Sequence, residues 1–324
     1  MPRIARILAH LIFGLVVLSG TAWSATALWL HLSGAPRLLA LAALGAAALA
    51  ALVLRARSRR AGWGALLVAA LAVGGWYQTI TPQQSRTWDR DVARGVTARV
   101  EGDIVTLGNV RDFDWTSPTE ATERWIERRH DLDRLETVDM LTSVWDSPDI
   151  AHLLVSFGFA DGEHVVFSVE IRREAGERFN EIGGFFRQFE LVLIGATERD
   201  IVRLRTDHRQ EDVRMYPVLL TPEQRRAMFL SYVGLAQRLE AEPAFYNTLT
   251  ANCTTVVYQL AKTLKSDLPL DWRLVMSGHL PEYLDSLGVL GGDGPLVDRI
   301  AAAGIGERAR AAAGREYSDA IRGR

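Results

Sequence analysis

The sequence is poor in three residue types, and each scarcity limits what the chain can be. It has one cysteine, Cys253, in 324 residues, which excludes an internal disulfide framework and a zinc site made of cysteines alone. It has no acidic residue before Asp89. Only two of its 37 basic residues are lysines, a bias that we interpret as genome composition.

The missing acids divide the chain into two parts of opposite charge. Residues 1–88 hold eight arginines and no acid, a charge of +8, whereas the remainder holds 29 basic and 39 acidic residues, a charge of −10. The larger part has no basic excess with which to neutralise phosphates, so we expect no nucleic acid as a partner. The length allows about two domains.

The acid-free part contains three long stretches without charge. Thirty residues separate Arg6 from Arg37, seventeen separate Arg37 from Arg55, and twenty-five separate Arg60 from Arg86. A helix needs roughly 20 apolar residues to cross the hydrocarbon core of a bilayer. The middle stretch also fits a buried helix, and the first fits a cleaved signal peptide, although no small-residue cleavage site with a polar mature start follows it. We predict three transmembrane helices, near 8–30, 38–54 and 62–79.

The arginines indicate how these helices are oriented. Arg3 and Arg6 precede the first helix, four arginines within 55–60 lie between the second and third, and the first connection has only Arg37. Because positive residues concentrate on the cytoplasmic side, we expect a cytoplasmic N-terminus in the inner (cytoplasmic) membrane and a periplasmic remainder. The predicted organisation is a membrane region over 1–86, an exported domain over 87–290, and an arginine- and alanine-rich tail over 291–324.

The exported part has the patterns of an α+β domain. Period-two alternation around turn residues predicts hairpins over 97–107 and over 153–171, the second turning at Ala160-Asp161-Gly162. Further strands are predicted at 189–196 and 201–206, and helices at 119–130, from Thr221 to about Glu240, and from just after Cys253 to about Leu264.

The second hairpin has one polar face that carries titratable groups. A turn centred on Asp161 pairs residues whose numbers sum to 322, which places His152 opposite Glu170, with Ser168 on the same face. Opposed side chains lie about 5 Å apart at Cβ, close enough for the carboxylate to orient the imidazole. The alternative is a solvated face with an incidental ion pair.

Cys253 lies in Asn252-Cys253-Thr254-Thr255, directly before an apolar-periodic helix. A helix N-terminus favours the thiolate, and the backbone amides at 253–254 are expected to hold an oxyanion. The alternative is a small buried hydrophobic residue.

Cys253, His152 and Glu170 together supply a nucleophile, a base and a group that orients the base. His279 is the rival base, whereas His130 and His208 are expected at the surface. The charged residues of 198–205 are interpreted as a surface network. No Gly-rich phosphate loop or metal-ligand spacing is present, so we expect no metal and no other cofactor. Nothing in the sequence indicates the oligomeric state.

Four ordered motifs resemble the Lnb N-terminal periplasmic domain family, over roughly residues 100–290. They are Asn109–Trp115, His152 with Ser156–Phe159, Ser168–Arg172, and Tyr246-Asn247 with Asn252–Thr255. Lnb proteins are bacterial lipoprotein N-acyltransferases, which move an acyl chain from the glycerol of a lipoprotein anchor to the amine of its N-terminal cysteine. The family is similar to permuted NlpC-type cysteine hydrolases and to lecithin:retinol acyltransferase.

The resemblance implies an antiparallel sheet with helices in a permuted NlpC- or papain-like arrangement. It implies that Cys253 is the nucleophile, His152 the base and Glu170 the third catalytic residue. The same motifs supply the supporting or substrate-binding candidates Asn252, Thr254, Ser168, Tyr246, Asn247 and Arg172. In Lnb proper, further membrane-embedded segments follow this domain, whereas here the predicted helices precede it.

We therefore expect a membrane-anchored cysteine acyltransferase that acts on a membrane lipid or lipoprotein through a thioester at Cys253. Two alternatives stay open at this point. One is a cell-wall amidase or peptidase that uses the same residues. The other is a membrane-tethered binding module in which Cys253 is merely buried.

Overall fold

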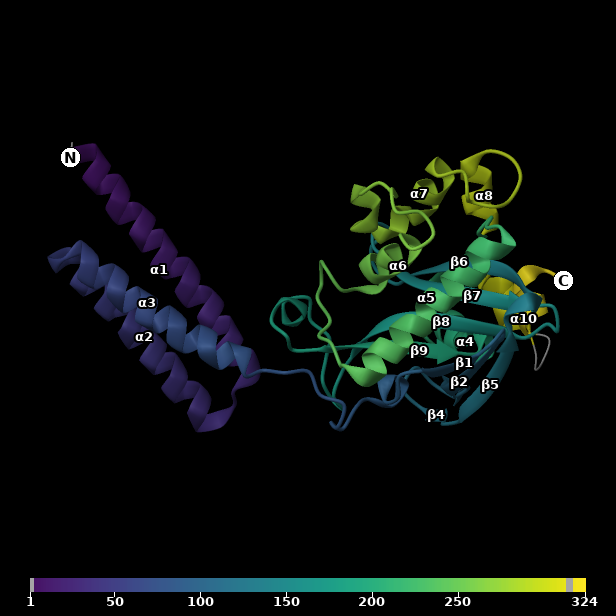
Figure 1. Cartoon of the computed structure of the whole chain (residues 1–324), viewed down its shortest axis with the longest axis horizontal. Coiled ribbons are helices and arrows are strands. Elements are labelled where there is room, and N and C mark those ends of the chain that lie inside the picture. Colours follow the sequence, from purple (N-terminus) through teal and green to yellow (C-terminus); the bar gives the residue numbers. More distant parts are fainter. Residues whose placement is uncertain (1–2, 313–316) are drawn as a thin grey trace. The chain divides into compact units, whose positions relative to one another are not determined.

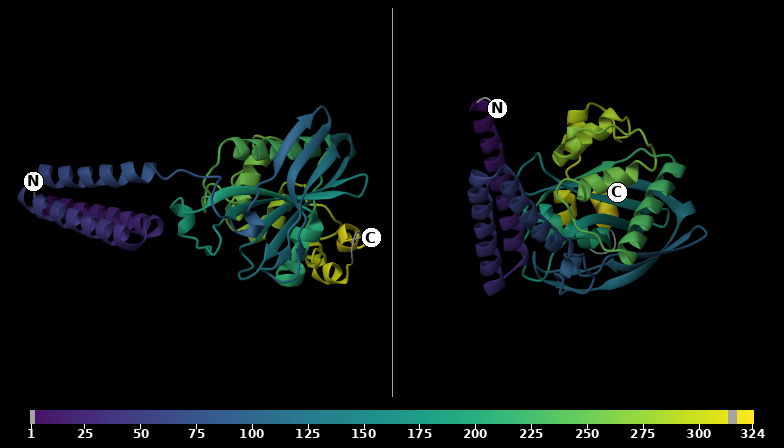
Figure 2. Two further views of the ribbon diagram at one scale, coloured as in Figure 1. Left: turned by 90° about the horizontal axis from the view of Figure 1, so that it is seen from below. Right: turned by 60° about the vertical axis from the view of Figure 1, so that its left-hand side comes forward.

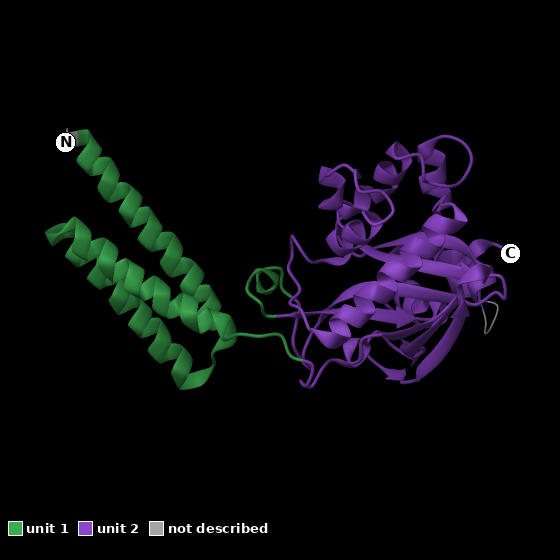
Figure 3. Cartoon of the chain, viewed as in Figure 1, with its two compact units in different colours: residues 1–83, 180–188 green, residues 84–179, 189–324 purple. Residues whose placement is uncertain are grey.

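The computed structural model describes residues 3–312 and 317–324, so residues 313–316 of the predicted tail lie outside the described part. The chain forms two compact units (Figure 3). One consists of residues 1–83 with the segment 180–188, and the other of residues 84–179 and 189–324. The segment that the sequence sets apart as a tail therefore packs within the second unit.

The first unit contains helices over all three predicted stretches, α1 (Arg3–His31), α2 (Gly34–Arg57) and α3 (Arg59–Gln78). Two helices, Ile4–His31 and Gly34–Arg57, are long and apolar enough to cross a membrane. In α3, four glycines and a Trp-Tyr-Gln end reduce the hydropathy. These helices support an N-terminal membrane anchor, but the predicted count of three spans is not confirmed.

The segment 180–188 packs with these helices within the first unit. It contains the short helix η3 (Gly183–Phe185), and the Phe186 ring is buried against Ala27 and Tyr77. The His31 ring donates from Nε2 to the Phe186 carbonyl at 2.6 Å.

The second unit is built on one mixed sheet with the order β1-β2-β9-β8-β7-β6-β10, and β5 also pairs with β2 (Figure 1). All neighbouring strands are antiparallel except β2 and β9, which pair in parallel at one position. β3 and β4 form a separate two-stranded sheet. The strands are β1 (Thr97–Glu101), β2 (Ile104–Arg111), β3 (Asp114–Trp115), β4 (Ala121–Thr122), β5 (Trp125–Asp131), β6 (Leu135–Val144), β7 (His152–Phe159), β8 (His164–Arg172), β9 (Glu190–Ala196) and β10 (Asp212–Pro217).

The β7–β8 hairpin has the predicted register, because Leu154 pairs with Ser168 and Phe157 with Val165. Both of its faces are nevertheless covered. Ser156 and Ser168, on the face predicted to be polar, are 0% and 1% exposed, so the alternative of a solvated face is wrong for these positions.

Helices pack on both faces of the sheet (Figures 1 and 2). On one face, α5 (Pro222–Ala241) and α6 (Cys253–Ala261) cover the core. The Phe229 ring of α5 meets Phe157 edge to face at 5.1 Å, and Tyr232 stacks on Phe167 at 4.9 Å. Burying one such ring contributes about 1.5–3 kcal/mol to the free energy of unfolding, so these aromatic contacts hold α5 on the sheet.

The opposite face is covered by α4 (Glu198–Arg203), α9 (Gly306–Ala311) and α10 (Tyr317–Arg322). A further apolar cluster joins the edge of the sheet to α6, α7 (Leu280–Ser286) and the region of α8 (Leu296–Ala302). The remaining short helices are η1 (Arg90–Val92), η2 (Leu132–Arg134), the π-helical turn η4 (Leu204–His208), η5 (Trp272–Leu274) and η6 (Ser277–His279).

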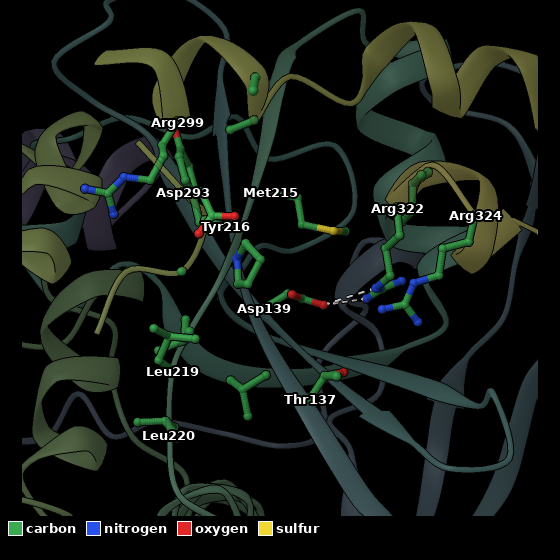
Figure 4. A pocket seen from close by; sticks show the side chains of 18 of the residues that line it. Thr137, Asp139, Met215, Tyr216, Leu219, Leu220, Asp293, Arg299, Arg322 and Arg324 are labelled. Carbon is green, nitrogen blue, oxygen red and sulfur yellow. Dashed lines mark hydrogen bonds and ion pairs between the residues drawn. The ribbon is translucent and has the colours of Figure 1, made fainter. Parts of the chain in front are cut away.

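The last helix, α10, borders a cavity of about 620 Å³ lined by acidic and basic side chains. Figure 4 shows Arg322 pointing at Asp139 across this cavity. Arg322 also makes a bidentate pair with Glu198, at 2.7 and 2.8 Å. The end of the chain is thus tied to the buried side of the sheet.

Two predicted elements are wrong. The stretch 119–130, predicted as a helix, forms β4 and β5, because pairing with β2 outweighs its local pattern. The stretch 201–206, predicted as a strand, belongs to α4 and η4. The Thr197 side chain caps α4 by accepting from the Asp200 amide at 3.3 Å, and this cap and the acidic first turn begin a helix.

Candidate active site

Cys253 is the first residue of α6, and its position is set by the residues before it. Asn252 caps the helix, because its Oδ1 accepts from the amides of Thr254 at 3.0 Å and Thr255 at 2.8 Å. The Thr255 hydroxyl accepts in return from the Asn252 amide at 3.0 Å, which completes a capping box. This reciprocal cap fixes the backbone at the cysteine.

The loop before α6 is held by Asn247. Its Oδ1 accepts from the amides of Leu249 and Thr250, both at 3.0 Å, and its backbone exchanges two hydrogen bonds with Ala251. Asn247 therefore shapes the approach to the cysteine, and no contact with the sulfur is seen for it among the described residues. These contacts are compatible with the supporting role that the resemblance implied.

The Cys253 sulfur is partly buried and lies among polar partners. The His152 side chain and the Leu153 amide are close enough to the sulfur to lower the pKa of the thiol, and the sulfur lies 3.8 Å from the Thr254 hydroxyl. The amide of Thr254 is already used by Asn252. Within the described residues the Cys253 amide makes no hydrogen bond, so it is the donor left for an oxyanion, and the prediction that 254 also donates is wrong.

Two residues of β8, Ser168 and Glu170, contact the His152 ring at Nε2. Its Nε2 lies 2.7 Å from the Ser168 hydroxyl and 3.1 Å from Glu170 Oε1. The Ser168 hydroxyl donates to the same Glu170 oxygen at 2.7 Å. The His152 and Glu170 side chains are 13% and 21% exposed.

These contacts shift the three titratable groups in complementary directions. Burial lowers the pKa of His152, but the Glu170 carboxylate and the hydrogen bonds to Cys253 and Glu170 raise it to about 9. Burial raises the pKa of the Cys253 thiol, but the hydrogen bond and charge of His152 bring it below its ordinary value. Against its burial, the His152 charge and the hydrogen bond to His152 hold the pKa of Glu170 well below its ordinary value. The arrangement therefore favours a thiolate beside an imidazolium.

The rival base, His279, is occupied elsewhere. Its Nε2 lies 2.9 Å from Asp149 and its Nδ1 3.3 Å from Glu282. Both ring nitrogens thus face carboxylates. His152 is the histidine that lowers the pKa of the Cys253 thiol.

Two further candidates, Tyr246 and Arg172, have different surroundings. Burial raises the pKa of Tyr246, and the charges of Cys253 and Glu170 raise it further, which places this tyrosine beside the site. Arg172 is directed away, because it donates to the carbonyls of Val92 at 3.1 Å and Ala93 at 2.7 Å. Its contacts tie η1 to β8, and the supporting or substrate-binding role that the resemblance implied for Arg172 stays a prediction.

Two features of the site were missed from the sequence. The first is buried charge under the sheet: Glu198, Asp200 and Arg205 are 1%, 0% and 4% exposed, so the interpretation as a surface network is wrong for these three residues, whereas Arg199 and Arg203 are partly exposed. His130 is likewise buried and stacks on Phe159 at 4.4 Å. The N-cap signal at Thr197 was the one clue in the sequence that the following charged residues belong to a helix and not to the predicted strand.

The second missed feature is an apolar cavity of about 190 Å³ whose wall contains chain neighbours of Cys253 and His152 but not these two residues themselves. Two residues that contact the sulfur, Leu153 and Thr254, are also in its wall. The rest of the wall is mainly apolar and includes Val257, Ala261 and Leu274. The described residues contain no group of three or more His, Cys, Asp or Glu side chains that could hold a metal ion.

Comparison with known proteins supports the family resemblance. The family model described as the Lnb N-terminal periplasmic domain matches residues 121–278, which include His152, Glu170 and Cys253. No curated protein and no solved structure matches the chain. This match indicates a membrane-associated periplasmic module. Residues 121–278 are therefore similar to the Lnb N-terminal periplasmic domain family, over nearly half of the chain.

Proposed function

We propose that the chain is a membrane-anchored cysteine acyltransferase that carries an acyl group on Cys253 as a thioester. The observation that supports this most directly is a thiol at a capped helix N-terminus whose pKa is lowered by His152, with an apolar cavity of about 190 Å³ lined by the next residue, Thr254. The polar side of the site fits nucleophilic catalysis. The apolar side fits the chain of a lipid.

In the first half of the proposed reaction, the Cys253 thiolate attacks the carbonyl carbon of an acyl ester. The oxyanion faces the Cys253 amide at the start of α6, where the helix dipole also stabilises negative charge. The C–O bond breaks, and the His152 imidazolium gives its proton to the departing alkoxide. The products are an alcohol and an acyl thioester on Cys253.

In the second half, neutral His152 takes a proton from the attacking amine while the amine adds to the thioester. The C–S bond breaks and the acyl amide leaves. The thiolate and the imidazolium are restored. Glu170 and Ser168 hold the imidazole in one orientation through both halves, as the third member does in related triads.

The proposal includes the finer predictions on topology and fold. We place the chain in the inner membrane with three spans, including α3, and with a cytoplasmic N-terminus. The four arginines of 55–60 between α2 and α3 support this orientation. The permuted NlpC-like arrangement is supported by the order of a histidine strand, β7, before a cysteine helix, α6.

A cell-wall amidase that uses the same residues is the second candidate. It requires a cleft with polar walls for a peptide or sugar. The cavity beside Cys253 is instead lined mainly by aliphatic and aromatic side chains, which favours the lipid substrate. A pure binding module requires a thiol without a functional partner, whereas Cys253 is a partly exposed residue whose thiol pKa is lowered by a histidine.

The direct test supplies both substrates to the full chain in lipid nanodiscs. A diacylated lipopeptide with a free N-terminal cysteine amine should gain an amide-linked acyl chain and lose a glycerol ester. A muropeptide should remain intact. Cleavage of the muropeptide with no change in the lipopeptide would instead identify an amidase, and no reaction of either would favour a binding module.

Ala261→Phe should separate chain binding from thiol chemistry. The added ring projects from the α6 wall into the apolar cavity and removes space for part of an acyl chain. Each methylene excluded from an apolar site loses about 0.8 kcal/mol, so two of them reduce acyl transfer about tenfold. Alkylation of Cys253 by iodoacetamide, a small reagent, should keep its wild-type rate. An unchanged rate of transfer from long-chain donors would show that the cavity does not hold the chain.

A further inference from the structure

Arg205 is a buried arginine behind the proposed catalytic residues. It lies on η4, the single π-helical turn that follows α4, and its side chain is 5% exposed. Isolated π-helical turns occur frequently at functional sites. A guanidinium cannot lose its charge in a protein, so a buried one needs a stable set of acceptors.

The guanidinium meets the same oxygen that orients His152. Its Nη2 donates to Glu170 Oε1 at 2.9 Å. This oxygen also accepts from the Ser168 hydroxyl at 2.7 Å and lies 3.1 Å from His152 Nε2. Three donors therefore converge on one carboxylate oxygen, and the Glu170 side chain cannot turn away without losing all three.

The other side of Arg205 is fixed to the protein. Its Nη1 donates to the Ile201 carbonyl at 3.0 Å, and its Nε lies 3.8 Å from Glu211 Oε2. Glu211 is itself bonded by the Ser143 hydroxyl of β6. Arg205 makes no contact with Cys253 or His152 within the described residues, so any effect on them passes through Glu170.

We propose that Arg205 is a positioning residue that keeps Glu170 ionised and aimed at His152, and thereby holds the thiolate–imidazolium pair at Cys253. This inference rests on the proposed function, because it takes the Cys253–His152 pair as the reacting unit.

The neighbouring charges alternate in sign around this contact. Arg209 lies 3.9 Å from Glu211 and 3.4 Å from Asp91 of η1, and Asp91 lies 3.1 Å from Arg173. The remaining groups that face Glu170 are Arg111 of β2 and Tyr246. Every cation here already has an anionic or carbonyl partner, so none is free to replace Arg205.

The test is the pH profile of Cys253 alkylation by iodoacetamide, measured on the full chain in nanodiscs. The chain has no other cysteine, so the label reports this thiol alone. Without Arg205, Glu170 is a buried carboxylate with one cation fewer, so its pKa rises and its support of the imidazolium weakens. Arg205→Met should therefore move the midpoint of alkylation to higher pH by about one unit, and Arg205→Lys should recover part of that shift.

Two comparisons separate positioning from folding. Arg203→Met removes a neighbouring arginine that is 37% exposed and, in the described part of the chain, pairs with Asp207 and no other acid, and it should leave the profile unchanged. Glu170→Gln should shift the midpoint as Arg205→Met does. The double variant should shift it no further, since both changes remove one interaction.

The outcomes distinguish the two proposals. A lower melting temperature for Arg205→Met with an unchanged or lower alkylation midpoint overturns the positioning role, as does a shift that adds to that of Glu170→Gln. If His152→Ala shifts the midpoint and Arg205→Met does not, the inference alone fails. If His152→Ala also leaves the midpoint unchanged, the thiolate–imidazolium pair and the proposed function both fail.

Discussion

His152→Ala should abolish acyl transfer nearly as completely as Cys253→Ala, with a loss of at least about 10³-fold for each. The reason is that the imidazole performs both proton transfers and supplies the cation that stabilises the thiolate. The residues of such a unit are strongly non-additive, so the double variant should be no slower than either single variant. The measurement is the rate at which the lipopeptide gains its amide-linked chain.

The matched control is the other histidine of the region. His279→Ala should retain most of the activity, because both of its ring nitrogens bond carboxylates away from the sulfur. Full activity in His152→Ala, or a loss in His279→Ala as large as that in Cys253→Ala, would mean that the base has been assigned to the wrong residue.

The second large effect concerns stability. Arg322→Met should lower the free energy of unfolding of the second unit by about 3–5 kcal/mol. Arg322 is 9% exposed and neutralises Asp139 and Glu198, which are 7% and 0% exposed (Figure 4). Its removal leaves two buried carboxylates without a cation. An uncompensated buried charge strongly destabilises the folded state. The change is measured by urea unfolding of the full chain in detergent. The unfolded fraction of the second unit at each urea concentration is determined from its susceptibility to proteolysis.

Arg324→Met supplies the comparison within the same part of the chain. Its side chain is exposed and makes no ion pair within the described residues, so the change should stay within about 0.5 kcal/mol of wild type. Equal stability of Arg322→Met and wild type would show that α10 does not contribute to the fold through this ion cluster.

Local signals in the sequence were sufficient for the centre of the site. The turn at Asp161 and the alternation around it predicted the β7–β8 register, and the register places Glu170 beside His152. The apolar periodicity after Cys253 predicted α6, which begins at Cys253 itself, where the capping box of Asn252 and Thr255 fixes its start. Features encoded by neighbours in the chain were therefore predictable.

Features that depend on distant residues were not. The strand β5 has a helical pattern and forms only because β2 lies beside it. Arg205 and Glu198 have the composition of a surface segment, and their burial follows from the packing of α9 and α10 over that face of the sheet. The apolar cavity is formed by residues from 138 to 289, a separation over which no local pattern reports contact.

The central claim is that Cys253 carries the acyl group, and intact mass spectrometry tests it most directly. The full chain is mixed with a diacylated lipopeptide that has no free acceptor amine. The reaction is quenched in acid, and the intact mass of the chain is measured. We predict a mass increase of one acyl chain, located on the peptide that contains Cys253, removed by neutral hydroxylamine, and absent from Cys253→Ser and His152→Ala. No adduct on the wild-type chain, or the same adduct on Cys253→Ser, would contradict the account.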